Sequence, residues 1–411
     1  MNKSDSQSIF INKNVLIGVS GSIAAYKIPE LIRLFVKKGA NVKVILTKDA
    51  VNFVTPLTIS TVSKNRPYVD FVDATNNTWY NHVKLAMCAD FFVISPATAN
   101  TIAKMATGIC DNILVATFLS ATCPIFCAPA MDRDMYLHSA TIKNIDIIRK
   151  RGVEILDVEK GELASGLHGF GRMCSLNKII ENIQQKLSSA MPFFGKRILI
   201  TAGPTYEKID PVRFIGNFST GKMGCELAKK AALYGASVDL VLGPSEEEIR
   251  HPNINLFNIQ SASQMLDECA CKFEFCDIAI FSAAVSDFRP KYTLDNKLKE
   301  KAIVIKTSFN KDIIATLSKK KKKQFVVGFA LETENEEENA INKLVQKDLD
   351  LIVLNSLNDK CSGFGYDTNK IKIIDRELSI QDYPLMKKSE LSGVILDKIL
   401  LKQQLLSLSK S

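Results

Sequence analysis

The stretch from Lys196 to Gly224 reads KRILITAGPTYEKIDPVRFIGNFSTGKMG. It opens with a short apolar run, Ile198–Ile200, which is typical of a buried parallel strand. A Gly-Pro turn and a long polar loop follow, and a helix is expected to begin after Gly221. A loop beyond the carboxyl end of a strand that leads into a helix N-terminus offers backbone N–H groups to an anion. The stretch therefore predicts an α/β domain with a nucleotide site.

Part of this stretch comes close to a phosphate-binding P-loop. Gly216–Met223 follows the pattern G-x-x-x-x-G-K, but methionine stands where a P-loop has serine or threonine. That hydroxyl would ligate magnesium, and Met223 has none to offer. We therefore expect an anion-binding loop of another type at this position.

The chain length of 411 residues exceeds what one hydrophobic core usually serves. The run Lys13-Asn-Val-Leu-Ile is echoed by Lys196-Arg-Ile-Leu-Ile, so both halves begin with the same kind of strand. We expect two doubly wound α/β domains, residues 1–190 and 191–411, rather than one continuous sheet. Met1–Asn14 is interpreted as a short leader without the features of a secretory signal.

The net charge of +9 is compatible with nucleic acid, a membrane surface or an anionic small substrate as partner. Aromatic and basic residues are not interleaved, so we expect no nucleic-acid partner. No apolar run reaches the roughly 20 residues that span a bilayer, so we expect no membrane partner. The lysines are dispersed except at Lys319–Lys323, which we interpret as a solvated helix end or loop.

Ten cysteines are scattered along the chain without the paired spacing of a metal site. The sequence has only four histidines and no secretory signal. Reduced, buried thiols are therefore favoured over disulfides or zinc, which points to the cytoplasm. The sequence names no set of metal ligands.

In the first half, the expected strand Val15–Val19 leads through a glycine-serine turn into an amphipathic helix, and a second strand, Val42–Leu46, follows. This order predicts a right-handed β-α-β unit with its ligand end at the first turn. The turn lacks G-x-G-x-x-G, and no acidic residue closes the second strand to hold a ribose. A dinucleotide is therefore disfavoured, whereas a mononucleotide phosphate bound by Ser20, Ser22 and backbone N–H groups fits.

Further strand ends in this half carry small or polar residues. Phe91–Ile94 is followed by Ser95–Asn100, and Pro124–Ala128 is followed by Pro129–Met135. A flat, flavin-sized ligand at the carboxyl edge of a sheet needs such residues. Gly161–Met173 is a glycine-rich flap that either closes over a site or is a plain surface loop.

His82 follows a Trp-Tyr-Asn sequence and precedes a helical stretch. Taken alone, it is interpreted as a structural histidine whose hydrogen bonds are satisfied. Beside a flavin-like pocket, its imidazole would suit proton abstraction near neutral pH.

Taken together, these motifs resemble one family. From about Lys13 to the C-terminal helix, the chain resembles the bifunctional phosphopantothenoylcysteine decarboxylase/phosphopantothenate-cysteine ligases of coenzyme A biosynthesis. The matching stretches run in the same order: Gly18–Lys27, SPATAN at 95–100, GRM at 171–173, TAGPT at 201–205, DPVRFIGNFSTGKMG at 210–224, AAVSDF at 283–288, VVGFALET at 326–333 and LDLIVLN at 349–355. Several specific motifs in one order are far more specific than any single glycine pattern.

For the first half, the resemblance implies a flavodoxin-like FMN domain with decarboxylase activity. In that family, FMN oxidises the substrate thiol to a thioaldehyde, carbon dioxide leaves, and the reduced flavin returns the hydride. His82 matches the family's catalytic histidine. We expect FMN to be bound by residues at the strand ends, namely Ser20, Gly21, Ser22, Thr47, Ser95, Thr98 and Asn100.

Two positions of the first half depart from the family's pattern. Asp132 stands where asparagine is usual, and an ionised carboxylate there would repel the substrate carboxylate unless it is paired. Ser165 replaces the proton-donating cysteine, and a hydroxyl is a far weaker acid than a thiol. Our hypothesis is that decarboxylation persists, with Ser165 relaying the proton or His168 supplying it. The alternative is an active ligase whose flavin-binding domain no longer decarboxylates and serves assembly or regulation.

For the second half, the resemblance implies a Rossmann-like ligase domain that uses CTP. The carboxylate of 4'-phosphopantothenate attacks the α-phosphate of CTP, and the amine of cysteine then displaces CMP from the acyl-cytidylate. Asn217 and Arg213 match residues that hold the acyl-cytidylate, and Lys297 matches a lysine on a mobile loop. Mg²⁺ would bridge the phosphate oxygens that Arg and Lys neutralise. The nucleotide-binding positions are expected at Ala283, Asp287, Asn310, Lys311, Asp312, Ile313, Phe329, Lys343 and Lys347.

Other interpretations remain open at this point. Without the resemblance, Lys343 and Lys347 are equally typical of an exposed i, i+4 face of a helix. The family places its flavin site between subunits, so the resemblance implies a homo-oligomer. A two-domain NAD-type oxidoreductase is disfavoured because the dinucleotide fingerprint is missing.

Overall fold

The computed structural model describes residues 8–73, 76–299, 304–356 and 365–408. The chain divides into two compact units, Met1–Ser188 and Ser189–Ser411. Within the described residues, no helix is both long enough and apolar enough to cross a membrane.

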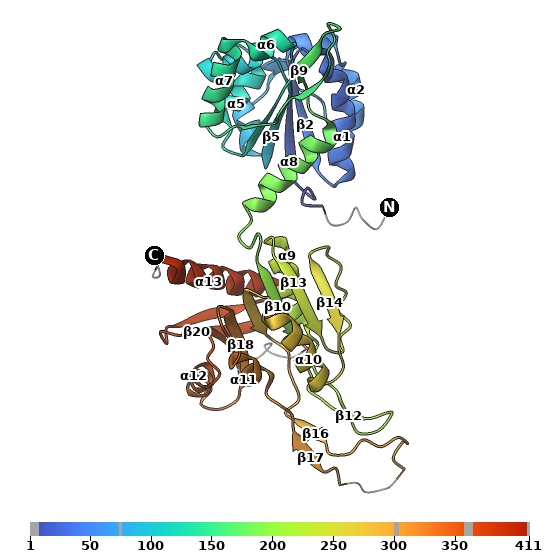
Figure 1. Cartoon of the computed structure of the whole chain (residues 1–411), viewed down its shortest axis with the longest axis vertical. Coiled ribbons are helices and arrows are strands. Elements are labelled where there is room, and N and C mark those ends of the chain that lie inside the picture. The colour runs from blue at the N-terminus through green and yellow to red at the C-terminus, as the bar shows by residue number, and fades with distance from the viewer. Residues whose placement is uncertain (1–7, 74–75, 300–303, 357–364, 409–411) are drawn as a thin grey trace. The chain divides into compact units, whose positions relative to one another are not determined.

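The sheet of the first unit is parallel and has the strand order β2-β1-β5-β6-β7 (Figure 1). Its strands are β1 Asn14–Val19, β2 Asn41–Leu46, β5 Phe91–Ala97, β6 Ile125–Pro129 and β7 Glu154–Ile155. Counted along the chain, this is the order 2-1-3-4-5 of the flavodoxin-like fold. Helices cover both faces of such a sheet, so its central strands are continuous apolar runs rather than alternating ones. The strand order reverses between β1 and β5, where this fold binds its ligands.

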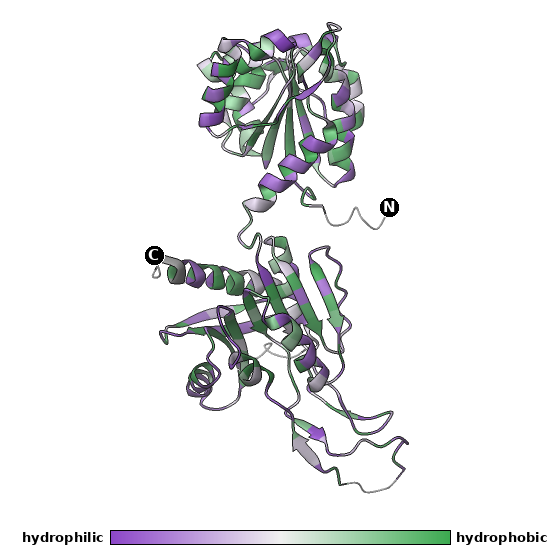
Figure 2. Cartoon of the chain, viewed as in Figure 1, coloured by the Kyte–Doolittle hydropathy of each residue, from purple (hydrophilic) through white to green (hydrophobic). Residues whose placement is uncertain are grey.

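Helices pack on both faces of this sheet, with their apolar sides inward and hydrophilic sides outward (Figure 2). One face is covered by α1 Ile28–Lys37, α2 Pro56–Ser63 and α8 Leu176–Ser189, and the other by α4 Ala99–Thr107, α5 Ile113–Ser120 and α7 Ser139–Lys150. The shorter elements are η2 Ile23–Lys27, η3 Lys48–Asn52, β3 Val72–Asp73, β4 Thr78–Trp79, α3 His82–Met87, α6 Arg133–Leu137, β8 Glu159–Glu162 and β9 His168–Arg172.

Three expectations for this unit need revision. The supposed leader is partly core, because Phe10 is fully buried and packs edge-on against Phe35 with ring centroids 5.3 Å apart; residues 1–7 of it lie outside the described residues. The third strand does not stop at Ile94 but continues to Ala97. The glycine-rich flap is the antiparallel hairpin β8–β9 rather than a plain loop.

The sheet of the second unit has the strand order β14-β13-β10-β15-β18-β19-β20-β21. Strands from β14 to β19 run parallel, and β20 and β21 extend the sheet in antiparallel fashion. The strands are β10 Arg197–Ala202, β13 Ser237–Leu242, β14 Ile254–Asn258, β15 Ile278–Phe281, β18 Phe325–Glu332, β19 Leu351–Ser356, β20 Thr368–Asp375 and β21 Ile380–Lys387. Along the chain, the parallel part has the Rossmann order 3-2-1-4-5-6 and reverses between β10 and β15.

Helices again cover both faces of the second sheet (Figure 1). On one face lie α9 Lys222–Leu233 and α13 Lys388–Leu408; on the other lie α10 Ala262–Phe273, α11 Ile313–Ser318 and α12 Glu336–Gln346. The polar loop after β10 contains a small hairpin of β11 Glu207–Lys208 and β12 Phe214–Ile215. The loop that carries Lys297 lies between β16 Phe288–Pro290 and β17 Thr307–Phe309, and its residues 300–303 are outside the described ones.

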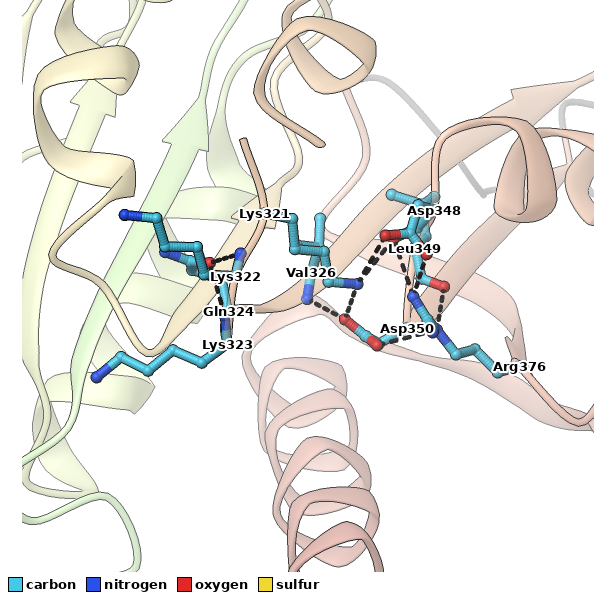
Figure 3. A network of polar contacts seen from close by, with 9 residues as sticks. All are labelled: Lys321, Lys322, Lys323, Gln324, Val326, Asp348, Leu349, Asp350 and Arg376. Atoms are coloured by element: carbon cyan, nitrogen blue, oxygen red, sulfur yellow. Dashed lines mark hydrogen bonds and ion pairs between the residues drawn. The ribbon is translucent and has the colours of Figure 1, made fainter. Parts of the chain in front are cut away.

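The basic run Lys319–Lys323 follows α11 and is exposed as expected, except at Lys321. The side chain of Lys321 is only 10% exposed, and its Nζ lies 2.7 Å from Oδ2 of Asp350. Asp350 also accepts the backbone N–H of Val326 at 2.7 Å and pairs with Arg376 at 3.0 Å (Figure 3). Lys321 therefore belongs to a network that holds the beginnings of β18 and β19 to the β20–β21 turn.

Candidate functional site

A cavity of about 570 Å³ lies at the carboxyl edge of the first sheet, at the point where the strand order reverses. Of the predicted flavin-binding residues, this cavity is lined by Gly21, Ser22, Thr47, Thr98 and Asn100. A Cβ on Gly21 would lie 2.5 Å from Cβ of Asp49, so only glycine lets the first turn approach the loop after β2 this closely.

The predicted residues Ser20 and Ser95 stay outside the described lining of this cavity. Ser20 is 1% exposed; its hydroxyl donates to the carbonyl of Pro96 at 2.7 Å and accepts the N–H of Thr98 at 2.9 Å. Ser95 is fully buried, and its hydroxyl donates to Sδ of Met173 at 3.3 Å. Ser20 therefore joins the ends of β1 and β5, and shapes the cavity without lining it.

The lining of the first cavity suits a phosphate joined to a flat ring. The helix α4 begins at the cavity with Thr98 as its N-cap, and the N–H groups of its first turn are suitable partners for a phosphate. Ser22 and Thr47 cap η2 and η3 in the same way. The apolar part of the lining, which suits an aromatic ring system, consists of Val69, Ile113, Ala130, Met131 and Met135.

Sequence reasoning missed two ion pairs in the wall of this cavity. Nζ of Lys48 lies 2.9 Å from Asp70, and Nζ of Lys104 lies 2.5 Å from Asp111. The hydrogen bond from Lys48 lowers the pKa of Asp70, and that from Lys104 lowers the pKa of Asp111. The carboxylates therefore stay ionised with their charges balanced; no recognisable motif contains them.

His82 is the first residue of α3, and its Nδ1 is buried without a hydrogen-bond partner among the described residues. Its ring packs edge-on against Phe71, with centroids 5.9 Å apart, and against Trp79 at 6.0 Å. The interpretation as a structural histidine with satisfied hydrogen bonds therefore has no support at Nδ1. His82 lies outside the described lining, but Phe71 directly follows the cavity residue Asp70. A buried, unpartnered ring nitrogen requires an explanation, and a role beside a bound ligand is one.

The two positions that depart from the family pattern lie in different settings. Asp132 directly follows Met131 of the lining and caps α6, with Oδ1 accepting the N–H of Arg133 at 2.6 Å. Ser165 lies exposed at the tip of the β8–β9 hairpin, where its hydroxyl accepts the N–H of Leu167 at 3.4 Å. His168 is exposed at the start of β9. Neither Ser165 nor His168 belongs to the described lining of the cavity.

The base of the hairpin, by contrast, is fastened to the cavity wall. The N–H of Met131 donates to the carbonyl of Gly171 at 3.1 Å. Gly171 has a φ of +133°, and a Cβ there would lie 2.4 Å from the carbonyl oxygen of Met131. This contact requires glycine, and it positions the flap beside Asp132.

A second cavity, of about 630 Å³, lies at the carboxyl edge of the second sheet and extends from the point where its strand order reverses. Most of the predicted ligase residues line it: Asn217, Ala283, Asp287, Asn310, Lys311, Asp312, Ile313, Phe329, Lys343 and Lys347. They come from segments that are far apart in the sequence, and the parallel strands bring them to one edge.

The stretch Lys196–Gly224 contributes the start of α9 to this cavity. Asn217 Nδ2 donates to the carbonyls of Ala284 and Val285, both at 3.1 Å, which fixes the loop to the end of β15. The helix α9 then begins after Gly221, whose φ is +81°. A Cβ on Gly224 would lie 2.5 Å from both Cβ of Ala202 and Oγ of Ser282, so this glycine lets the first turn of α9 pack on the strand ends.

Lys343 and Lys347 lie in the cavity wall, each beside a carboxylate. Nζ of Lys343 is 2.6 Å from Glu332, and Nζ of Lys347 is 2.8 Å from Asp312. Burial would raise the pKa of Asp312, but hydrogen bonds from the Ala315 N–H and from Lys347 hold it below its usual value. The side chain of Lys343 is nonetheless 43% exposed and that of Lys347 24% exposed, so both lie at the rim between a carboxylate and solvent.

Arg213 and Lys297 lie outside the described lining of the second cavity. Asp210, which sequence reasoning missed, joins their two loops: it is 1% exposed and accepts the N–H groups of Val212, Arg213 and Leu298. Arg213 in turn donates to the carbonyl of Leu298 at 3.2 Å. The loop that carries Lys297 is thus tied to the loop that carries Arg213.

Further residues that the sequence did not assign to a site also line the second cavity: Lys222, Asn355, Asn369 and Lys388. Lys222 and Asn355 lie within motifs noted in the sequence, whereas Asn369 and Lys388 lie in none. All four lie outside the expected nucleotide positions, and only the β19–β20–β21 extension and α13 bring three of them here. In the described part of the chain, no cluster of three or more His, Cys, Asp or Glu side chains could hold a metal ion.

Comparisons with known proteins agree with this architecture. Residues 4–188 match the family model described as Flavoprotein, and residues 193–402 match the DNA/pantothenate metabolism flavoprotein C-terminal domain. The chain is 48% identical to a Cysteine/Cysteine sulfinic acid decarboxylase from an unknown prokaryotic organism, over 84% of this chain and 99% of the relative. It is 40% identical to the Coenzyme A biosynthesis bifunctional protein CoaBC of Bacillus subtilis (strain 168), over 94% of this chain and 97% of that protein.

Among solved structures, the C-terminal domain of a Coenzyme A biosynthesis bifunctional protein CoaBC is 38% identical. It covers 52% of this chain and 99% of its own length, with a TM-score of 0.45. The family resemblance drawn from the motifs is confirmed by the full-length relatives and by both family models. The chain belongs to the family of the bifunctional coenzyme A biosynthesis proteins.

Proposed function

We propose that this chain joins cysteine to 4'-phosphopantothenate in a CTP-dependent ligation and then decarboxylates the product, phosphopantothenoylcysteine, to 4'-phosphopantetheine with FMN. Ligation is assigned to residues 191–411 and decarboxylation to residues 1–190. The observation that carries the proposal is the convergence of the expected nucleotide-binding residues, from Asn217 to Lys347, on one cavity at the reversal point of the second sheet.

In the ligase cavity, the chain's own residues supply charge and position. Lys311, Lys343 and Lys347 provide cationic groups for phosphate oxygens, and Mg²⁺ would accompany the triphosphate. Asn217, in the loop before α9, is held by the carbonyls that follow β15 and positions the acyl-cytidylate. Arg213 and Lys297, whose loops are joined at Asp210 through the N–H groups of Arg213 and Leu298, would reach the substrate from outside the cavity wall.

In the first cavity, the strand-end hydroxyls and the N-terminus of α4 would hold the FMN phosphate, and the apolar residues would hold the ring. When bound, FMN supplies the redox chemistry that makes the carboxylate a leaving group. His82 is proposed to move a proton at the substrate, and its unpartnered Nδ1 supports this. Ser165 or His168 is proposed to return a proton, which requires the hairpin tip to approach the cavity.

We also propose that the chain works in the cytoplasm and as a homo-oligomer. Within the described residues, nine cysteines are free, which suits a reducing compartment. The oligomer is implied by the family resemblance alone, and light scattering on the purified protein measures it.

One experiment tests both activities. The full chain is incubated anaerobically with CTP, Mg²⁺, cysteine and 4'-phosphopantothenate, and products are followed by liquid chromatography with mass detection. We expect CMP, pyrophosphate, phosphopantothenoylcysteine and then its decarboxylated product. CMP formation without carbon dioxide release would support the ligase activity and the alternative of a first unit that does not decarboxylate.

A parallel reaction tests the substrate of the first unit, because the 48% identical relative is named for cysteine and cysteine sulfinic acid. Free cysteine and cysteine sulfinate replace phosphopantothenoylcysteine in this arm. We expect carbon dioxide release from phosphopantothenoylcysteine only. Comparable release from either free amino acid would contradict the assignment and transfer the relative's named activity to this chain.

A further inference from the structure

The helices α9 and α13 begin next to one another at the second cavity. Each has a lysine as its first residue, Lys222 and Lys388, and both lysines line the cavity. The helices pack along their lengths: a Cβ on Gly393 of α13 would lie 3.4 Å from Cε of Lys230 on α9. Asp367 connects the two starts, because it pairs with the ammonium of Lys222 and its carbonyl accepts the N–H of Lys388 at 2.9 Å.

The two lysines differ in how well the protein supports their charge: the hydrogen bond with Asp367 raises the pKa of Lys222, whereas the surroundings of Lys388 disfavour a cation. The N-terminus of a helix carries partial positive charge, and here two such ends meet. Lys388 is only 5% exposed, and burial, together with the neighbouring Lys222, lowers its pKa. The helix α9 adds backbone N–H groups, since its cap residue Gly221 has no side chain to accept them. This corner of the cavity therefore favours an anion.

A second observation shows that the same corner is prepared for a ligand. Oδ1 of Asn355 is buried in the cavity wall and has no hydrogen-bond partner among the described residues. The pairing of Asn355 with Ile371, and of Asn369 with Met386, puts both amides at the end of the sheet extension from which Lys388 follows. A ligand with a hydrogen-bond donor near its anionic group would satisfy Asn355.

We propose that Lys388, together with Lys222 and the first-turn N–H groups of α9, binds the phosphate chain of the nucleoside triphosphate. The inference rests on the proposed nucleotide-dependent ligation and adds a binding residue from the C-terminal helix to it. Two ammonium groups and a helix N-terminus match several negative charges better than the single carboxylate of cysteine. On binding, Lys222 exchanges the carboxylate of Asp367 for a phosphate oxygen.

The test measures binding to the full chain by titration calorimetry with three probes: CTP, inorganic tripolyphosphate and cytidine. The variant Lys388→Gln is compared with Lys387→Gln, whose exposed side chain lies outside the described lining of the cavity. We expect Lys388→Gln to weaken CTP and tripolyphosphate about tenfold to a hundredfold, as for loss of one charged hydrogen bond. Cytidine binding stays unchanged, and Lys388→Arg recovers most of the loss.

Three outcomes overturn the inference. The first is that Lys388→Gln binds tripolyphosphate as tightly as the wild type. The second is that the variant loses as much affinity for cytidine as for CTP. Either result would mean that Lys388 does not contact the phosphate chain. A raised KM for cysteine with unchanged CTP binding would assign the corner to the cysteine carboxylate. If Lys388→Gln lowers the thermal midpoint of unfolding, the variant Lys222→Gln is measured in its place and judged by the same criteria. If the wild-type protein binds tripolyphosphate but not CTP, CTP is not the nucleotide of the proposed function, and the phosphate-binding subsite is retained.

Discussion

At the residue scale, Asn217 connects the stretch Lys196–Gly224 to the chemistry of the second cavity. Its amide donates to two carbonyls at the end of β15, so its orientation is set by the strand it faces. We expect Asn217→Ala to lower the ligation rate at least tenfold, because about one or two hydrogen bonds that position the reacting group are lost. CTP binding should change little. Quenched time courses of CMP release measure the ligation rate, and titration with CTP measures the binding.

The control for this prediction is Asn258→Ala. Asn258 ends β14 and is an exposed amide outside the described lining of the cavity. Ligation by this variant should equal that of the wild type. Unimpaired ligation by Asn217→Ala would remove Asn217 from its proposed role.

The cysteines provide a prediction in which burial decides reactivity. Burial raises the pKa of Cys127, Cys225, Cys269 and Cys276 to about 12, so hardly any thiolate exists at neutral pH. We expect iodoacetamide at pH 8 to label the exposed thiols first: Cys88, Cys110 and Cys271. Peptide mass mapping of the native chain checks this order, and a urea-unfolded sample serves as control. Rapid labelling of Cys225 in the native protein would contradict the packing of α9.

At the element scale, the Lys321–Asp350 pair joins three parts of the second sheet (Figure 3). Both side chains are 10% exposed, and Asp350 also accepts the N–H that begins β18. We expect Asp350→Ala to lower the free energy of unfolding by about 2 to 3 kcal/mol, since it leaves the buried ammonium of Lys321 with only the Asp348 carbonyl at 2.8 Å and the Asp348 carboxylate at 3.6 Å. Urea denaturation of the full chain, followed by circular dichroism, measures the loss.

The neighbouring ion pair between Lys322 and Glu274 provides a matched control. Its side chains are 72% and 63% exposed, so water and salt screen the pair. Lys322→Met should leave the unfolding transition where it is. Equal effects of Lys322→Met and Asp350→Ala would mean that burial is not what makes the Lys321 network stabilising.

The start of α11 provides a pH dependence. The pKa of Asp312 in the folded chain lies below its usual value, so the carboxylate stabilises the fold above about pH 4. This contribution is lost as the pH falls through the unfolded pKa towards the lower folded one. We expect Asp312→Asn to flatten the decline of the thermal midpoint between about pH 5 and pH 3. An unchanged pH profile in this variant would contradict the role of the Lys347 pair.

At the scale of the whole molecule, the two units have separate hydrophobic cores, one pair of clusters in each. We therefore expect calorimetry of the full chain to resolve two transitions. FMN should raise the midpoint temperature of one transition, and CTP with Mg²⁺ that of the other. At a ligand concentration a hundredfold above Kd, each ligand should stabilise its unit by about 2.7 kcal/mol. A single transition that both ligands raise together would contradict independent unfolding of the units.

Local patterns predicted much of the fold. Continuous apolar runs such as Val15–Val19 and Ile198–Ile200 are buried parallel strands because helices cover both faces of each sheet. The antiparallel extension escaped prediction: the strand Ile380–Lys387 is mostly exposed and has no apolar pattern that marks it. The buried state of Lys321 also escaped, because a run of lysines indicates solvent until a distant carboxylate is shown to face it.

The sequence by itself determined which residue types stand at the strand ends, and it identified the family through motifs that must keep their local spacing. It also determined the loop from Lys196 to Gly224, because a strand, a glycine turn and a helix start are local features. Only the tertiary structure decided which side chains share a cavity. Asn355, Asn369 and Lys388 join Asn217 there because sheet pairing and helix packing act between segments far apart in the chain. No local pattern records such contacts, which is why the place of Lys388 beside Lys222 in the cavity appeared only in the folded molecule.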